Sequence, residues 1–333
     1  MNSLERVLAR IEGRETDRIP NLNILMQFAA REIGAEYSKY CRDYKLLAQA
    51  NILCARKYGI DVVTTMSDPM REAHDFGAEV VFPEDDVPYA KVDFLKDISD
   101  LKKLKPVKPE DGRRMSQSVL AIEYYKKEAG DELAVIGWVE GMFAEAADLR
   151  GVNNFLMDLY DEEDFVEDLC ETLFQNAVGF ARAQMEAGAD IIGVGDAISS
   201  VAGPNAYRRF AGKYQRKLLA AIKDMGAKTK LHICGNTLPF LDQLPKDVID
   251  ILDVDWMVPL EAAVEQLGGS CCLSGNYDPV AIILQGNPET IEQEVRGCAQ
   301  IGGNKHMSSA GCEIPKHTDP ENLMTVKRVL ERI

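Results

Sequence analysis

Residues 190–234 read DIIGVGDAISSVAGPNAYRRFAGKYQRKLLAAIKDMGAKTKLHIC. Two short apolar runs, DIIGVGD and TKLHIC, stand at the ends of this stretch. The segment between them has helical spacing over residues 205–226, with Pro204 directly before it and Gly226 at its end, as helix start and stop signals predict. The order predicts a strand, a crossover helix and a second, parallel strand.

Six further short apolar or β-branched runs have the same character. They are PNLNILM from Pro20, IDVVTTM from Ile60, LAVIGWV from Leu133, VIDILDVD from Val248, CCLSGN from Cys271 and KHMSSAG from Lys305. Stretches with helical spacing, such as residues 162–188, lie between most of them. Eight strands alternating with helices predict an α/β fold, a single closed (β/α)₈ TIM barrel spanning residues 1–333 as one domain.

The gap between the second and third predicted strands, about residues 67–132, is longer than a crossover needs. It contains FPEDDVPYAKVDF (82–94) and LKKLKPVKPEDG (101–112), which are rich in proline and charge. We interpret this segment as an insertion that decorates the barrel and could act as a lid.

Composition excludes several classes of function. The formal net charge of -16 disfavours nucleic acid and anionic membranes as partners, because both require a basic surface. No apolar run is long enough for a membrane span, and the N-terminus MNSLERVLARIEGRETDRIP is not a secretory signal, so we expect a soluble, cytoplasmic protein. The eight cysteines include no C-x-x-C pair and are expected to be reduced thiols. Small molecules and other proteins remain as partners.

Barrel enzymes place their sites at the carboxyl ends of the strands. The polar residues at the predicted strand ends are Gln27, Ser67, Asp68, Glu140, Asp196, His232, Cys234, Asp255, Asn276 and, after the eighth strand, Cys312. We expect a functional site to draw on these residues.

His232 and Cys234 suggest a metal site within that set. Residues i and i+2 of a strand share a face for purely geometric reasons, and a buried cysteine often serves only as a small apolar residue. The strand ends at this point, however, so both side chains are expected at the barrel mouth, with Cys312 in SSAGCEIP (308–315) nearby. Three ligands of the His/Cys/Cys type with an open fourth position are typical of catalytic zinc.

The remaining cysteines and histidines have plainer interpretations. We predict packing or loop roles for Cys41, Cys54, Cys170, Cys271, Cys272, Cys298, His306 and His317. EAHDFG (72–77) partly imitates the D-x-H-x-x-G signature of corrinoid-binding domains, but Glu72 replaces the aspartate and no doubly wound domain follows. We therefore do not expect His74 to bind cobalt.

Together these motifs resemble the superfamily of uroporphyrinogen decarboxylase and the corrinoid-linked methyltransferases related to it. The resemblance runs from RVLARIEGRETDRIP (6–20) through EGMFAEAADLRG (140–151) and LHICGNT (231–237) to SSAGCEIPKHTDPENL (308–323). The decarboxylases hold tetrapyrrole carboxylates with arginines near the first strand, where this chain has Arg31 alone. The methyltransferase branch binds zinc through a His-x-Cys and a distant Cys, which implies His232, Cys234 and Cys312 as ligands.

The resemblance implies a zinc-dependent methyltransferase that works with the corrinoid of a separate protein, met in a transient complex. MSDPMREAHDFGAEV (66–80) is similar to methyltransferases from bacteria that use methoxylated aromatics, so we favour a methyl ether as donor to cobalt, an O-demethylation. The alternative, methyl transfer from a methylcobamide to a thiol, suits the anionic His/Cys/Cys ligand set. A metal-free uroporphyrinogen decarboxylase and a non-enzymatic barrel subunit remain as further alternatives.

Other strand-end residues receive provisional roles. Asp255 or Glu140 would close the empty coordination position of the zinc, and Asp196 and Asn276 would line the pocket. Asp68 falls where the decarboxylases keep a catalytic aspartate. Each of these has an alternative role as a loop-capping or hydrogen-bonding residue.

Overall fold

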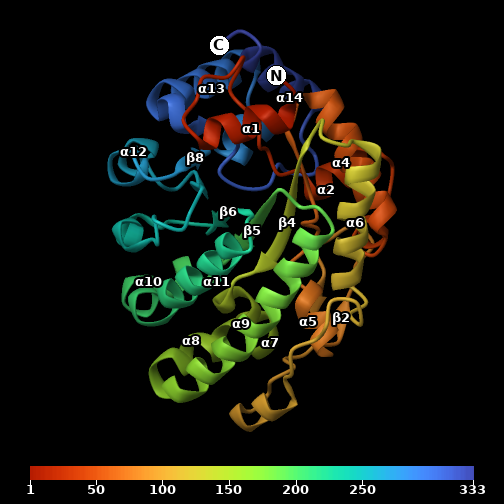
Figure 1. Ribbon diagram of the computed structural model, residues 1–333, viewed down its shortest axis with the longest axis vertical. Helices are drawn as coiled ribbons and strands as arrows, with labels where there is room; N and C mark the ends of the chain where they lie inside the picture. The colour runs from red at the N-terminus through yellow and green to blue at the C-terminus, as the bar shows by residue number, and fades with distance from the viewer.

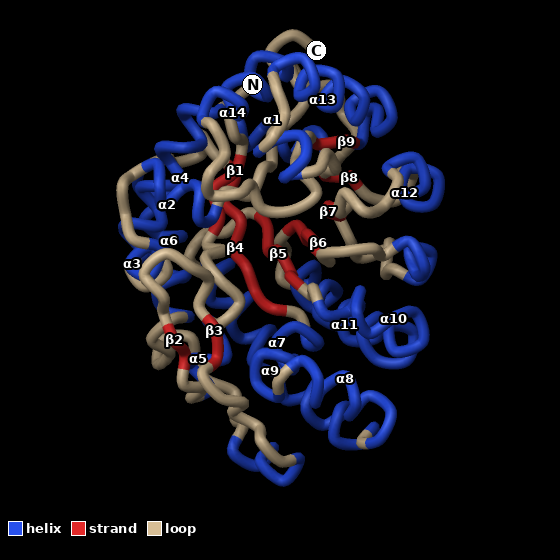
Figure 2. Tube along the Cα trace, turned by 180° about the vertical axis from the view of Figure 1, so that it is seen from behind, coloured by secondary structure: helices blue, strands red, loops and turns tan.

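A computed structural model describes the whole chain, residues 1–333, and its main sheet has seven parallel strands. Their order is β1 (Val62–Thr64), β4 (Ala134–Glu140), β5 (Ile191–Gly195), β6 (Lys228–His232), β7 (Ile251–Asp253), β8 (Cys272–Ser274) and β9 (His306–Met307). Figure 2 shows them side by side in the middle of the molecule. Seven of the eight predicted runs thus contain a strand, and the α/β barrel prediction is confirmed.

The eighth position of the barrel is filled by residues 20–22, which form a single bridge rather than a strand. Ser308 N donates to Pro20 O and Leu22 N donates to Ser308 O, both at 2.8 Å, while Asp61 N donates to Asn21 O at 2.9 Å. This segment therefore lies between β9 and β1 and closes the ring. Pro20 has no N–H to donate, which helps to explain why the predicted strand is so short.

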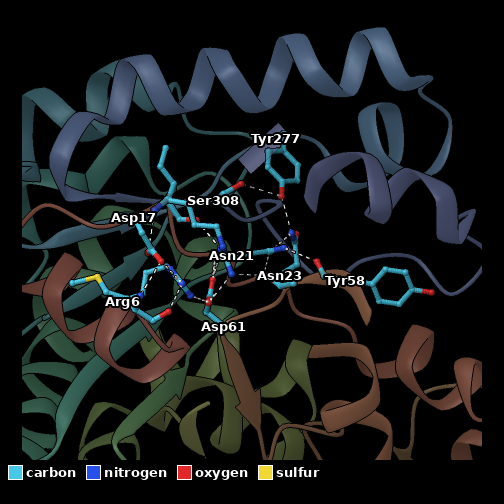
Figure 3. A network of polar contacts seen from close by, with 12 residues as sticks. Arg6, Asp17, Asn21, Asn23, Tyr58, Asp61, Tyr277 and Ser308 are labelled. Carbon is cyan, nitrogen blue, oxygen red and sulfur yellow. Dashed lines mark hydrogen bonds and ion pairs between the residues drawn. The ribbon is translucent and has the colours of Figure 1, made fainter. Parts of the chain in front are cut away.

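The closure is fixed by a buried polar network around Asp61 (Figure 3). The Asp61 carboxylate is fully buried and accepts hydrogen bonds from Arg6 Nη1 at 2.6 Å, Arg18 Nη1 at 2.7 Å and Asn21 N at 2.7 Å. Asn21 Oδ1 in turn accepts from Asn23 Nδ2 at 2.8 Å. One carboxylate thus joins the N-terminal helix, the bridging segment and the start of β1.

Helices surround the strands, and both chain ends lie on the same side of the molecule, at the top of Figure 1. The helices outside residues 67–132 are α1 (Ser3–Ile11), α2 (Met26–Glu32), α3 (Tyr37–Tyr40), α4 (Tyr44–Tyr58), α7 (Met142–Arg150), α8 (Val152–Asp161), α9 (Glu163–Glu186), α10 (Ile198–Ala206), η2 (Tyr207–Ala211), α11 (Gly212–Asp224), η3 (Leu238–Gln243), α12 (Leu260–Leu267), η4 (Pro279–Leu284), α13 (Pro288–Gly302), η5 (Gly303–Lys305) and α14 (Pro320–Leu330). None of them is both long enough and apolar enough to cross a membrane.

The helix predicted for residues 205–226 is present and has the expected boundaries. Gly203 leaves the helical conformation with φ 81°, so the helical path starts afresh at Pro204 and runs through η2 into α11. Gly226 follows its end with φ 97°, a left-handed conformation that favours glycine.

Residues 67–132, predicted as an insertion, contain five elements. They are α5 (Arg71–Phe76), β2 (Val80–Val81), β3 (Tyr89–Ala90), η1 (Ile98–Lys103) and α6 (Met115–Glu128). α6 packs against α4 and β4 as a barrel helix does, and Tyr125 Oη donates to Thr64 O at 2.8 Å. The antiparallel pair β2 and β3 and the segment around η1 extend away from the chain ends (Figure 1). A lid function for this part remains a prediction.

We expect Asp61→Asn to lower the free energy of unfolding by about 3 kcal/mol, because it removes the charge that partners two largely buried guanidinium groups. Chemical denaturation followed by circular dichroism measures the change. Asp17→Asn is the matched control: Asp17 also pairs with Arg6, but its side chain is 45% exposed, so we expect a loss below about 1 kcal/mol. Equal effects of the two substitutions would contradict a special role for the buried carboxylate.

Candidate metal centre and its pocket

The structure brings His232, Cys234 and Cys312 together at the barrel mouth. His232 is the last residue of β6, Cys234 follows it by two positions, and Cys312 lies in the loop after β9. His232 Nε2 is 2.9 Å from Cys234 Sγ, and the two sulfurs are 3.7 Å apart. All three ligand atoms lie within 4.8 Å of one another, and both cysteines are free thiols. Such a group can hold one metal ion.

The imidazole of His232 is oriented by a buried carboxylate. Its Nδ1 lies 3.0 Å from Asp253 Oδ2, and Asp253 is the register partner of His232 on β7. Burial alone would raise the pKa of Asp253, but the contacting ammonium of Lys230 lowers it to about 2. The ionised carboxylate accepts a hydrogen from Nδ1, which leaves Nε2 as the nitrogen that faces the sulfurs. This carboxylate–histidine arrangement is typical of metal-binding histidines.

The two thiols are poised for metal binding. Donation from Cys234 lowers the pKa of Cys312 to about 4, and the same hydrogen bond raises the pKa of Cys234. Thiolate is the form of cysteine that binds metals. Two sulfurs and one imidazole nitrogen suit Zn²⁺, and a three-residue set leaves a position open, as in catalytic zinc sites.

Asp255, predicted as a further ligand, is engaged with the backbone. Its Oδ2 accepts from Gly235 N at 2.8 Å and its Oδ1 accepts from Met257 N at 2.9 Å. The carboxylate therefore fixes the loop that carries Cys234, and it is not one of the three grouped ligands. A role as fourth ligand remains a prediction.

The three ligands lie in the wall of a pocket of about 220 Å³. The other lining residues are Ile24, Met26, Met66, Asp68, Pro69, Val87, Trp138, Glu140, Gly195, Asp196, Ala197 and Glu313. This volume is below the roughly 300–1,000 Å³ common for ligand pockets, so the pocket suits a small molecule.

Glycines of β5 make room for the ring of Trp138, which lines this pocket. A Cβ on Gly193 would come within 2.4 Å of Trp138 Cε3, and one on Gly195 within 2.8 Å of Cζ2. The indole ring centre lies 6.2 Å from that of His232, and its Nε1 donates to Glu140 Oε1 at 3.1 Å. The alternating glycines of IIGVG are therefore a steric requirement of the pocket wall.

Asp68 and Glu140 line the pocket, and each is paired with a buried arginine. Asp68 Oδ2 accepts from Arg114 Nη2 at 2.5 Å; burial opposes ionisation, but the guanidinium groups of Arg114 and Arg71 lower the pKa of Asp68. Glu140 Oε1 accepts from Arg71 Nη2 at 3.0 Å, yet burial raises the pKa of Glu140 to about 8. The pocket thus holds one firmly ionised acid and one that titrates near neutral pH.

Asp196 and Asn276 hold backbone in place. Asp196 Oδ1 accepts from the N–H groups of Phe143 and Ala144 at the start of α7, so it lines the pocket as a helix cap. Asn276 Nδ2 donates to Asp255 O at 3.2 Å and Val258 O at 2.6 Å, and its side chain does not line this pocket. These contacts agree with the alternative role of Asp196 and Asn276 as loop-capping or hydrogen-bonding residues.

The structure adds several residues to the site that the sequence patterns did not indicate. Glu313 lines the pocket, and burial raises its pKa to about 7; it also accepts from Gln27 N at 2.9 Å. Its position beside Cys312 was the available signal. Strand register could have indicated Asp253, and the spacing of two positions before His232 could have indicated Lys230. Arg71 and Arg114 gave no such signal, because they lie in the segment that we interpreted as an insertion.

The other cysteines and histidines do not join the ligand group. Cys41, Cys54, Cys170, Cys271, Cys272 and Cys298 are buried and free, as is typical of packing residues. His306 is buried with Nε2 2.5 Å from Gly275 O, and His317 is exposed in a loop. His74 Nδ1 lies 3.0 Å from Asp75 Oδ1.

Behind Glu140 lies a cluster of buried acids around the single guanidinium of Arg71. Burial raises the pKa of Glu72, and it raises those of Glu145 and Asp148 well above the usual values. Neither carboxylate oxygen of Glu145 has a hydrogen-bond partner. One arginine cannot balance four carboxylates, so protons must be retained in this cluster near neutral pH.

Comparisons with known proteins identify the family of this chain. Residues 2–332 match the family described as uroporphyrinogen decarboxylase (URO-D). The chain belongs to this family. The superfamily resemblance inferred from the motifs is therefore confirmed.

Within the uroporphyrinogen decarboxylase family, the chain is similar to proteins of both branches. The methylcobamide:CoM methyltransferase MtbA of Methanosarcina acetivorans is 27% identical over 325 residues, which cover 96% of this chain and 94% of that protein. A uroporphyrinogen decarboxylase of Aeromonas salmonicida is 25% identical over 305 residues, covering 88% and 84%. The structure of a methyltransferase from Methanosarcina mazei superposes with a TM-score of 0.90 at 22% identity, covering 100% and 99%. This last likeness establishes the fold.

We expect the purified protein to contain about one zinc ion per chain and Cys312→Ser to lose most of it, because the variant removes one of three ligands. Elemental mass spectrometry measures the content. Cys298→Ser, a buried cysteine outside the ligand group, is the control and should keep its zinc. A metal-free wild type purified without chelators would contradict the site.

We expect Glu145→Gln to stabilise the protein at pH 8 and to change little near pH 4.5. Burial raises the pKa of Glu145 in the folded state, so the fold favours the protonated side chain. The stability that this side chain contributes is present below the unfolded-state pKa of about 4.3 and is lost as the pH rises. Glutamine stays neutral at every pH, so the variant does not lose this stability at pH 8.

Denaturation midpoints at the two pH values test the Glu145 prediction. Glu123→Gln, on the exposed face of α6, is the control, and its denaturation midpoint should differ from that of the wild type by the same small amount at both pH values. A lower midpoint for Glu145→Gln at pH 8 would show that the ionised carboxylate is stabilising, contrary to the prediction.

Proposed function

We propose that this protein transfers a methyl group from the methylcobamide of a separate corrinoid protein to the sulfur of a small thiol. The observation that carries the proposal is the His232, Cys234 and Cys312 group, which lies in the wall of a small pocket at the barrel mouth.

The relatives favour this thiol alternative over the methyl ether expected from the sequence. MtbA proteins of two Methanosarcina species, each 27% identical and covering 96% of this chain, are named for methyl transfer between a methylcobamide and CoM. The anionic His/Cys/Cys ligand set points the same way, because it leaves little Lewis acidity for activating an ether. An O-demethylation receives no support from these relatives.

Zn²⁺ held by His232, Cys234 and Cys312 would coordinate the sulfur of a substrate thiol directly and so keep that thiol ionised near neutral pH. Asp253 holds the imidazole of His232 in the tautomer that presents Nε2, and Asp255 holds the loop of Cys234. These two carboxylates position the ligands and do not touch the substrate.

In the reaction, the thiolate sulfur attacks the methyl carbon and forms the sulfur–carbon bond. The carbon–cobalt bond breaks with its electron pair left on cobalt, which passes from cobalt(III) to cobalt(I). The thiol proton must leave first, and we assign its uptake to Glu140, which lines the pocket. Its Oε1 accepts hydrogen bonds from Arg71 and Trp138, whereas its Oε2 accepts none. A pKa of about 8 suits such an exchange.

A corrinoid protein must reach the mouth, and the segments that follow the strands there carry exposed apolar side chains. They follow β5, β6, β7 and β8 in turn: Val201, Leu238, Trp256, Met257 and Val280. Exposed apolar side chains can contribute to a surface that meets another protein. This rim supports a transient complex.

The decarboxylase alternative fits the pocket poorly. Uroporphyrinogen carries eight carboxylates, whereas the pocket wall includes no lysine or arginine and encloses about 220 Å³. Asp68, the candidate for that chemistry, is tied to Arg114 and Ser67. These features favour a small substrate over a tetrapyrrole.

We expect the zinc-loaded protein to form a methyl thioether and cob(I)alamin from methylcobalamin and 2-mercaptoethanol. Cys234→Ser should lower the rate at least about a hundredfold, because a zinc ligand is lost. Visible absorption and mass spectrometry follow the two products, and Cys298→Ser serves as the control. Coproporphyrinogen formed from uroporphyrinogen by metal-free protein, without any thioether, would overturn the proposal in favour of the decarboxylase.

A further inference from the structure

The charged side chains of the pocket wall are all acidic. Asp68, Glu140, Asp196 and Glu313 line it, and neither lysine nor arginine does. A zinc ion bound by two thiolates carries no net charge, so the metal centre would add no positive charge for an anionic substrate. The wall therefore lacks any group that could pair with a sulfonate or carboxylate.

The two guanidinium groups behind the wall are already engaged. Arg114 binds both oxygens of Asp68, at 2.5 and 3.4 Å. Arg71 binds Glu140 Oε1 at 3.0 Å and Asp68 O at 2.7 Å. Both side chains are buried, and each meets the pocket only across a carboxylate. The Nε of each is buried without a hydrogen-bond partner, and neither arginine lines the pocket, so neither guanidinium meets a substrate directly.

The rest of the wall suits uncharged or cationic groups. Met26, Met66 and Val87 present apolar surface, and the face of an indole such as Trp138 attracts cations. An anion buried here would lose its hydration and face the ionised Asp68 and three further acids without a cationic partner, which is unfavourable even at a moderate effective dielectric constant.

We propose that the small molecule bound beside His232, Cys234 and Cys312 is a neutral or cationic thiol, and that anionic thiols are rejected. This inference rests on the proposed methyl transfer to a thiol and specifies its substrate class. It excludes coenzyme M as the preferred methyl acceptor of this chain, because coenzyme M is 2-mercaptoethanesulfonate, an anionic thiol.

A series of thiols of similar size tests the proposal: 2-mercaptoethanol, cysteamine, 2-mercaptoethanesulfonate and 3-mercaptopropionate. Isothermal calorimetry on the zinc-loaded protein, without a corrinoid partner, measures binding, and buffers of different ionisation enthalpy report proton release. Methylation by methylcobalamin is measured in parallel. We expect the neutral and cationic members to bind about tenfold or more tightly than the anionic ones.

Tighter binding and faster methylation of 2-mercaptoethanesulfonate than of 2-mercaptoethanol would overturn the charge selection and leave the proposed methyl transfer standing. Failure of all four thiols to bind, with no thioether formed, would overturn the proposed function itself. The two failures are thus distinguishable.

A variant that adds a cation tests the physical cause. Val87 lies between β2 and β3 and lines the pocket, so Val87→Arg places a positive charge at the wall. We expect it to shift the binding preference toward 2-mercaptoethanesulfonate about tenfold relative to wild type. Val87→Gln, polar but uncharged, is the matched control and should leave the preference unchanged. Equal shifts in both variants would contradict an electrostatic origin.

Discussion

The hydrogen bonds that Pro20, Asn21 and Leu22 exchange with Ser308 and Asp61 close the parallel strands into a ring, and the site depends on this closure. The same N-terminal segment continues into the mouth and anchors the loop of Cys312: Asn23 Oδ1 accepts from Ala310 N and Ile24 O accepts from Ile314 N, both at 2.8 Å. Without the closure, Cys312 would have no fixed place relative to Cys234, which precedes it by 78 residues.

Two layers of carboxylates act differently around the mouth. Asp253 and Asp255 serve the ligands, one through the imidazole of His232 and the other through the backbone after Cys234. Asp68 and Glu140 line the pocket and accept hydrogen bonds from the guanidinium groups of Arg114 and Arg71, respectively. In the methyl transfer that we propose, the same acidic wall would take up the thiol proton and set the charge of the molecule that enters. The proposed proton transfer and the proposed substrate selection would then have the same structural origin.

Most of the strands and the candidate metal ligands could be predicted because their signals are local. Short β-branched runs such as IDVVTTM (60–66) and the i, i+2 pair of His232 and Cys234 need no distant partner to be recognised. Cys312 needed the barrel hypothesis, which places all strand ends at one mouth. The strand expected at Pro20 shortened to a bridge because a buried carboxylate, Asp61, takes the N–H of Asn21.

The sequence by itself determined the alternation of strands and helices, the barrel, and the three residues fit to bind zinc, because periodicity and residue type are properties of neighbouring positions. Only the tertiary structure decided what surrounds them. It turned Asp196, Asp255 and Asn276 toward backbone groups, and it brought Arg71 and Arg114 to the acids of the wall. Which charges meet across a folded chain depends on contacts between distant segments, and a pattern along the sequence does not carry that information.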